Sequence, residues 1–420
     1  MEKVYPIIVF FILIFFRVRI AYALLSVSLI FPLLQISENF FFYRIIVLNI
    51  FKVFENDLMV TIPFFVYFGV LIKNSNLGND FLKFLDSFKI KSLDTIFLSL
   101  FSIIVGMSVS IAGSALVIFK QITDFFKDRK SKKIRIMMVA AFGTLAQLMP
   151  PALSLIILYN ASYGVIAGYT KNFFTNDKIS ILDFYYEVSF FSIFLVLVYL
   201  FYFLYIQNNK VKKKKLEKYK IIKVLFFFLL FLICPILTFT GTVPPQYSIV
   251  LSCMTVLISV IYFCKNKTNI LANSFNETIK ITGYVYLLVI ASTIFSLFLN
   301  YFYTLNINII FSNKLLTDIF IYSFIIILLG FFMEFIEISI IFVPIFLAFF
   351  LENYSINSID FLILTALLLQ LSFLTPPFGW TIFYLSGLYP ATSTVEIIKV
   401  LIPLNILLFI FIVLFIFYSF

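Results

Sequence analysis

The sequence predicts an all-α polytopic membrane protein whose two halves repeat the same order of elements. Of its 420 residues, 63% are hydrophobic and 12% are charged, which is about half the charged fraction of an ordinary soluble domain. Continuous apolar runs of about 20 residues recur along the chain, and each is long enough to cross roughly 30 Å of hydrocarbon. Because these runs do not alternate polar with apolar residues, they favour helices over a β-barrel.

Two pairs of adjacent prolines interrupt apolar segments, one pair in each half of the chain. Pro150 and Pro151 lie in GTLAQLMPPALSLIILY, and Pro376 and Pro377, followed by Gly379, lie in LQLSFLTPPFGWTIFYL. Proline removes an amide donor and collides with the carbonyl four residues earlier, so neither helix continues unaltered. In hydrocarbon, a freed carbonyl is tolerated only where protein buries it or where it lines a polar cavity. Two broken helices in corresponding positions are typical of secondary transporters that bind their substrate near the bilayer midplane.

The N-terminal region is expected to contain short apolar helices. Residues 4–35 hold two apolar runs separated by Arg17 and Arg19, which predicts a tight turn or a staggered pair of helices. An interfacial amphipathic helix is expected at 38–57, followed by a span that is kinked at Pro63. The first apolar run follows a single lysine and precedes no small-residue cleavage site, so we expect it to be retained as a span.

Basic residues gather in three clusters between the predicted spans, at 127–135, 210–220 and 265–267. Successive clusters are separated by two predicted crossings, so all three are expected on the cytoplasmic side. Membrane topology thereby explains the net charge of +11, and contact with anionic lipid headgroups is favoured over binding of nucleic acid. The further spans are predicted at about 184–206, 221–239, 246–264, 281–303 and 399–420.

Each proline pair is preceded by an apolar stretch that small or charged residues interrupt. In the second half this stretch covers 318–352, and aligning the halves on their prolines gives an offset of 226 residues, 376 minus 150. An internal repeat of a transporter leaves such a pattern. Small residues in the first stretch indicate either close helix packing or a re-entrant hairpin with exposed backbone at its tip. The interrupting residues are Gly106, Ser108, Ser110, Gly113 and Ser114 in the first half, and Gly330, Glu334 and Glu337 in the second.

Glu334 and Glu337 are three residues apart, so they share one face if this piece is helical. A carboxylate at bilayer depth costs about 2.5 to 3.5 kcal/mol on insertion scales and needs a partner, a cation or a proton. We therefore expect a coupling-ion or proton site or a scaffold for a hairpin tip, unless one carboxylate sits near the interface and is solvated. Histidine is absent and the three cysteines lack ligand spacing, which excludes a zinc site and a histidine general base. Without such partners, an intramembrane enzyme or a polymer flippase is disfavoured.

Oxygen atoms near the two breaks are the second group of candidates. A hard monovalent cation prefers neutral carbonyl and hydroxyl oxygens, and half-helix N-termini present free amides to a substrate carboxylate. The predicted cation-binding residues are Ser108, Ser110, Gly113, Ser114, Thr144, Gln147, Glu334, Glu337, Thr375 and Gly379. The predicted substrate-binding residues are Pro150, Pro151, Gln370, Ser372, Pro376, Pro377 and Thr381.

Four segments together resemble the large membrane subunit of tripartite ATP-independent periplasmic (TRAP) transporters, the DctM-like permeases. The resemblance covers about residues 10–415 in order, and the LTPP-[VF]-G segment is its most specific part. The FLTPPFG and FxEI forms are most similar to the branch for mannitol, chloroaromatic compounds and 2-oxo acids. The segments are IPFFVYFGVLI, GTLAQLMPPALSLIIL, GFFMEFIEISIIFVPIF and LQLSFLTPPFGWTIFYLSGLYP.

The resemblance implies an elevator-type transporter, in which two re-entrant hairpins and two Pro-broken helices slide as an inverted repeat against a scaffold. The hairpins would be at about 97–125 and 320–350. Na⁺ would be the coupling ion, with no cofactor. A periplasmic binding protein would deliver a small organic anion, such as a 2-oxo acid or a dicarboxylate, and a separate small four-helix membrane subunit would support the scaffold. The expected location is the bacterial inner membrane, with many crossings.

The expected organisation alternates scaffold and transport elements. A stand-alone inverted-repeat Na⁺/anion symporter, which needs no binding protein, is the alternative that shares this architecture. The predicted units are N-terminal scaffold helices at 1–92, transport repeat 1 at 93–160, scaffold helices with the basic loop at 161–300, transport repeat 2 at 301–390 and a C-terminal helix at 391–420.

Overall fold

The computed structural model is helical throughout the part of the chain that it describes. Four helical segments are long and apolar enough to cross a membrane, or five if the bent pair at 335–353 forms one span. The chain is therefore a polytopic membrane protein, as predicted. The described residues are 5–16, 18–34, 39–55, 57–75, 91–108, 129–172, 180–206, 243–264, 266–302, 311–312, 314–331, 333–375, 381–382, 385 and 394–420.

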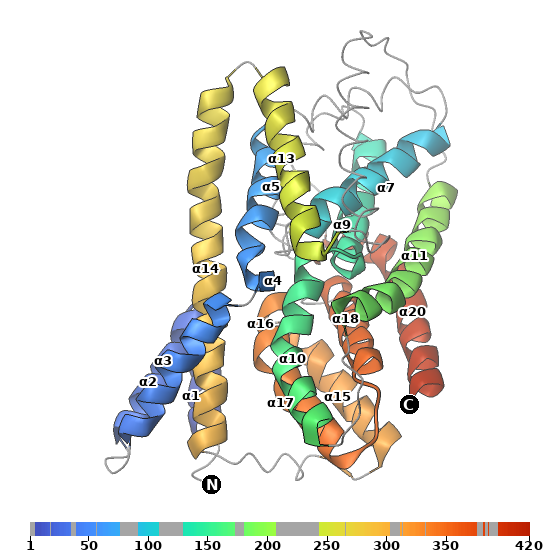
Figure 1. Ribbon diagram of the computed structural model, residues 1–420. Helices are drawn as coiled ribbons and strands as arrows, with labels where there is room; N and C mark the ends of the chain where they lie inside the picture. Colours follow the sequence, from blue (N-terminus) through green and yellow to red (C-terminus); the bar gives the residue numbers. More distant parts are fainter. Residues whose placement is uncertain are drawn as a thin grey trace.

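A single long helix, α14 (Lys267–Phe302), organises the N-terminal elements (Figure 1). The helices α2 and α3 pack along it, and α1 packs on α2. The Phe10 ring lies 5.5 Å from that of Phe295, and the Phe31 ring lies 6.3 Å from that of Phe298. The two short helices on either side of the arginine-containing turn therefore lie against the same half of α14. Their bounds are α1 Tyr5–Phe15, α2 Ile20–Leu34 and α3 Asn39–Glu55.

The other half of α14 packs against α5 (Ile62–Asn74), which also contacts α13 (Pro245–Phe263). The predicted span near 281–303 falls in this helix, which begins earlier, at Lys267. Lys73 forms an ion pair with Glu277, and Asn74 Nδ2 lies 3.1 Å from Ser274 Oγ. These contacts give the polar first turns of α14 a partner within the protein, so the helix extends past its apolar section.

The predicted kink at Pro63 is present. The short helix α4 (Asp57–Val60) ends before Thr61, and α5 follows at once. Because Pro63 has no N–H, the carbonyl of Met59 has no helical donor. The hydroxyl of Tyr286 on α14 donates to this carbonyl at 2.8 Å. A neighbouring helix thus stabilises the kink by supplying the missing hydrogen bond.

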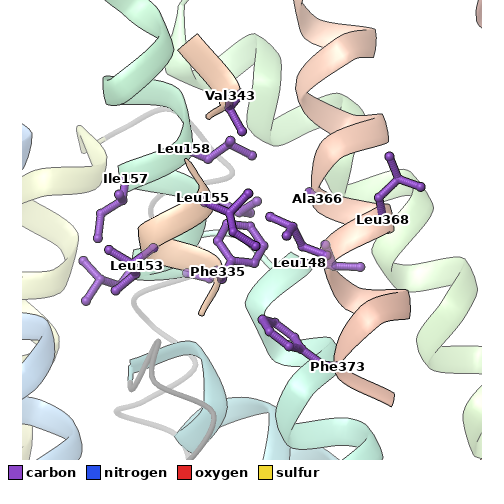
Figure 2. Packing of buried hydrophobic residues seen from close by; sticks show 14 of the residues in the cluster. Leu148, Leu153, Leu155, Ile157, Leu158, Phe335, Val343, Ala366, Leu368 and Phe373 are labelled. Atoms are coloured by element: carbon purple, nitrogen blue, oxygen red, sulfur yellow. The ribbon is translucent and has the colours of Figure 1, made fainter. Parts of the chain in front are cut away.

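The repeated elements form a second group around α18, which is buried from Ser358 to Leu374 at every residue except Asp360. Figure 2 shows Leu155 of α10, Phe335 of α16 and Ala366 of α18 meeting in this core. Lipid tails are as apolar as these side chains, so close van der Waals packing stabilises such a core. The bounds are α7 Lys91–Ser108, α9 Arg129–Leu145, the 3₁₀ helix η2 Ala146–Leu148, α10 Leu153–Asn172, α15 Leu315–Leu329, α16 Phe335–Ile341, α17 Val343–Asn353 and α18 Ser358–Leu374.

Two further spans, α11 (Ile181–Ile206) and α20 (Thr394–Ser419), pack on α18 with most of their apolar surface outward. Both contain a predicted span and begin three to five residues before it. Tyr202 Oη of α11 donates to the carbonyl of Val400 at 2.8 Å, close to Pro403 in α20. The predicted span at 221–239 and the basic cluster at 210–220 lie outside the described residues.

Candidate functional site

The first proline pair ends one helix and starts another, as predicted. The helix α9 gives way to the 3₁₀ helix η2, the chain turns at Pro150 and Pro151, and α10 begins two residues later. The peptide bond between the two prolines is cis, and both residues are buried.

Both carbonyls that this proline pair deprives of helical donors find partners within the same segment. The prolines would have donated to Ala146 and Gln147, four residues earlier. Instead, the N–H of Met149 donates to Ala146 O at 3.1 Å, and Ser154 Oγ donates to Gln147 O at 2.8 Å. The carbonyls freed at the first break therefore accept hydrogen bonds from residues of the same segment.

The second break is closed differently. The helix α18 ends at Leu374, and the N–H of Thr375 donates to Ser372 O at 3.3 Å. Thr375 Oγ1 also donates to Leu371 O at 2.6 Å. The amide of Asn405, which is buried in α20, donates to the terminal carbonyl of Leu374. Sequence reasoning missed Asn405, although an amide within a strongly apolar span is a signal that could have identified it.

Thr144 and Gln370, which were predicted to bind a cation and the substrate respectively, contact one another. The Gln370 amide lies 3.1 Å from Thr144 Oγ1, and the two side chains are 1% and 2% exposed respectively. In the amide orientation that satisfies every partner, the nitrogen donates to Thr144 O at 2.9 Å and the oxygen accepts from Leu145 N at 3.2 Å. Thr144 Oγ1 also donates to the carbonyls of Ala140 and Ala141. Both side chains thus have polar partners inside the protein.

A glycine of the preceding helix packs against each broken helix at a matching position. A Cβ added at Gly106 would lie 2.6 Å from Ala146 Cβ, and one added at Gly330 would lie 2.6 Å from Ser372 Cβ. Ala146 and Ser372 are 226 residues apart, the offset between the proline pairs. Close packing, one of the two alternatives for the small residues of the first stretch, is therefore present at Gly106, and Gly330 packs as closely in the second half.

The segment from α15 to α17 turns back on itself. The ring of Phe311, just before α15, stacks on that of Phe349 near the end of α17 with centroids 4.3 Å apart. Asp318 in the first turn of α15 accepts hydrogen bonds from Ser312 Oγ and from the hydroxyl of Tyr354, which follows α17. The two ends of the segment are therefore adjacent. Between α16 and α17 the chain bends by 44°.

Glu334 and Glu337 form a capping box at the turn of this segment. Glu334 is the N-cap of α16, and Glu337 is its third residue. The carboxylate of Glu337 accepts from the N–H of Glu334 at 2.9 Å, and the side chain of Glu334 accepts from the backbone in return. This arrangement satisfies amide donors at the helix start. Among the three predicted roles, the geometry favours a scaffold for the hairpin tip.

Several predicted residues have polar atoms that the described residues do not satisfy. Thr381 is fully buried, and its Oγ1 has no hydrogen-bond partner among them. The same holds for Ser339 Oγ in α16, while Gln147 is buried in η2. Ser108 is the last residue of α7, but its side chain is not described. Ser110, Gly113, Ser114, Pro376, Pro377 and Gly379 lie outside the described residues.

Comparison with protein families identifies the chain at the level of family. The family model described as "Tripartite ATP-independent periplasmic transporter, DctM component" matches residues 7–419. The chain belongs to this family. Among curated proteins, none matches the chain. It is therefore a multi-pass DctM transporter component and not an enzyme. The match is to the DctM family as a whole, so the branch expected from FLTPPFG stays a prediction.

The DctM assignment gives a physical meaning to the two breaks. A transporter must place polar groups within the bilayer, although the hydrocarbon supplies no hydrogen-bond partners. Broken helices provide such groups without exposing backbone to lipid. In this DctM chain the described polar groups near the breaks are mostly bonded to each other, and the oxygens of Ser339 and Thr381 are the described exceptions among the candidates. No cluster of three acidic, cysteine or histidine side chains occurs in the described part.

Proposed function

We propose that this DctM chain is the large permease subunit of a TRAP transporter that imports a small organic anion, such as a 2-oxo acid or a dicarboxylate, by Na⁺ symport. A periplasmic binding protein delivers the anion, and a separate four-helix membrane subunit supports the scaffold in the bacterial inner membrane. The observation that carries this proposal is the family match over nearly the whole chain. Membership of a tripartite family favours this arrangement over the stand-alone symporter.

The packing supports an elevator mechanism with an inverted repeat. Both broken helices belong to one core, and each packs against a glycine of the helix that precedes it. The adjoining ends of the 311–354 segment support a re-entrant hairpin, since such a hairpin returns to the side from which it enters. In Figure 1, α15 lies in the lower half of the view and α7 in the upper half, as hairpins entering from opposite faces would.

Two buried neutral oxygens in the second half of the chain are the described candidates for the Na⁺ site. Ser339 Oγ and Thr381 Oγ1 are buried polar atoms with no hydrogen-bond partner in the described part. An unsatisfied hydroxyl in a buried site costs free energy unless a ligand or water completes it. Together with Thr375 and Gly379, these oxygens would supply the uncharged ligands that a sodium ion prefers. The substrate carboxylate would lie at the start of α10, where free amides and the helix dipole favour an anion.

Proteoliposome uptake tests the proposal. The chain is co-reconstituted with its small membrane subunit, and accumulation of labelled 2-oxo acids and dicarboxylates is followed with the cognate binding protein outside. We expect accumulation only when an inward Na⁺ gradient and the binding protein are both present. Uptake that needs no binding protein would instead establish the stand-alone symporter. Uptake that is unchanged when K⁺ replaces Na⁺ would overturn Na⁺ coupling.

Single substitutions test the ion site. Thr381→Ala and Thr375→Ala are expected to raise the Na⁺ concentration for half-maximal uptake by about tenfold, which corresponds to about 1.4 kcal/mol of lost ion binding. Gln147→Ala is expected to abolish Na⁺-dependent uptake while membrane expression is retained. Thr293→Ala is the matched control, because the Thr293 hydroxyl bonds only to the Val289 carbonyl of its own helix. An unchanged sodium dependence in the first three variants would remove those residues from the site.

A further inference from the structure

The contact between Thr144 and Gln370 joins corresponding positions of the two halves. Thr144 lies six residues before the first proline of its pair, and Gln370 lies six residues before the first proline of the other pair, 226 residues later. Sequence separation does not require this match, since any of the buried residues of α18 could have faced Thr144.

A contact between corresponding residues has a geometric meaning. A twofold rotation that exchanges two similar units carries each residue onto its counterpart, so a residue that touches its own counterpart lies at the rotation axis. The two glycine contacts are consistent with similar units, because Gly106 against Ala146 and Gly330 against Ser372 use equivalent positions of the two broken helices. The Thr144–Gln370 contact is therefore where an axis relating the broken helices would pass.

The amide of Gln370 also explains why the first helix ends earlier than the second. The helix α9 ends at Leu145, whereas α18 ends at Leu374, the counterpart of Leu148. The amide bonds to Thr144 O and Leu145 N, at the point where α9 changes to 3₁₀ geometry. A side-chain amide that donates to the Thr144 carbonyl replaces the α-helical donor that this carbonyl loses where the geometry changes.

We propose that Thr144 and Gln370 are positioning residues on an internal twofold axis, where their hydrogen bonds hold the two proline-broken helices in register as one body. Neither side chain then serves as an ion or substrate ligand in this state, because each is already bonded to the other half. The helix α11 packs against α9, η2 and α18, so three segments of the fold meet around this contact. The uptake measurements that test this proposal rest on the proposed function, whereas the melting-temperature measurements do not.

Exchange of the two residues tests the inference. Thr144→Gln and Gln370→Thr each place identical residues at the axis, whereas the double variant restores one hydroxyl and one amide with the two halves interchanged. We expect each single variant to lower the maximal rate of uptake by about tenfold, an increase of about 1.4 kcal/mol in the activation free energy, with little change in half-saturation by Na⁺ or substrate. The double variant is expected to recover most of this loss.

Melting temperatures of the purified chain in detergent give a readout that does not need transport. We expect the single variants to melt lower than the parent by a few degrees and the double variant to regain most of the difference. A double variant no better than the worse single variant in both assays would overturn the inference. If the exchanged chain cannot be purified, the variant Thr144→Val, which keeps the volume of the side chain, tests the inference. A lower maximal rate of uptake with unchanged half-saturation by Na⁺ supports a positioning role. An increased Na⁺ concentration for half-maximal uptake overturns the inference.

Discussion

Adding one methyl group at Gly330 is expected to separate the hairpin from the broken helix α18. The new Cβ would lie 2.1 Å from Ser372 Oγ and 2.6 Å from Ser372 Cβ. The hydroxyl could rotate away only by giving up its bond to Leu369 O at 2.7 Å, and the Cβ cannot rotate at all. Because carbon atoms in contact need roughly 3.5 Å, the two segments must part by about 1 Å. Overpacking of this kind costs about 1 to 3 kcal/mol.

The expected loss is measurable as a lower melting temperature and a lower rate of uptake. At about 2 to 4 °C per kcal/mol, which is typical of domains of 150 to 250 residues, Gly330→Ala should lower the melting temperature by roughly 2 to 12 °C. Ser372→Gly removes both clashing atoms, so the double variant should be more stable than Gly330→Ala alone. Gly164→Ala and Gly283→Ala are matched controls, since a Cβ at either position meets nothing within 4 Å.

The first half gives a contrasting outcome for the same change. A Cβ at Gly106 would lie 2.4 Å from the carbonyl oxygen of Gly143 as well as 2.6 Å from Ala146 Cβ. Gly106→Ala should therefore be at least as harmful, and Ala146→Gly should not rescue it, because the backbone oxygen remains. Unchanged stability and uptake in Gly330→Ala, or a failure of Ser372→Gly to improve it, would refute the reasoning.

Three further substitutions address hydrogen bonds at helix breaks. Tyr286→Phe leaves the Met59 carbonyl without its donor and should destabilise the purified chain by about 0.6 to 2 kcal/mol, measured by thermal unfolding in detergent. Ser154→Ala removes the donor to the Gln147 carbonyl and should lower the free energy of unfolding by about 1 to 3 kcal/mol. A melting temperature equal to the parent's would show that another donor replaces the hydroxyl. Glu337→Gln keeps a capping oxygen but removes the charge, so unchanged uptake supports the capping role and lost Na⁺ dependence supports an ion ligand.

The breaks and their spacing could be predicted because proline acts locally. The missing N–H and the ring clash depend only on the proline and the four residues before it, so the sequence predicts that a helix ends before each proline pair. The offset of 226 residues read from the prolines also separates Thr144 from Gln370 and Ala146 from Ser372. Local chemistry therefore locates the two breaks.

The partners of the freed backbone groups could not be predicted. Tyr286 and Asn405 donate hydrogen bonds to carbonyls of residues 227 and 31 positions away in the sequence. A single sequence does not indicate which distant side chain will be the donor. The start of α14 was missed for the same reason, because its polar turns depend on the ion pair with Lys73. The capping role of Glu337 was within reach: a residue that can cap, followed three positions later by glutamate, is a recognised helix start.

The two breaks are equivalent in position but not in how they are closed. In the first, Ser154 of the same segment donates to the freed carbonyl of Gln147. The counterpart of Ser154 is Trp380, which has no hydroxyl, and in the second half Asn405 of α20 donates to Leu374 O, the last carbonyl of α18. A displacement of α20 relative to α18 would therefore open the second break and leave the first intact. Since Thr375 and Thr381 flank that second break, the half whose backbone depends on another helix is also the half expected to bind the coupling ion.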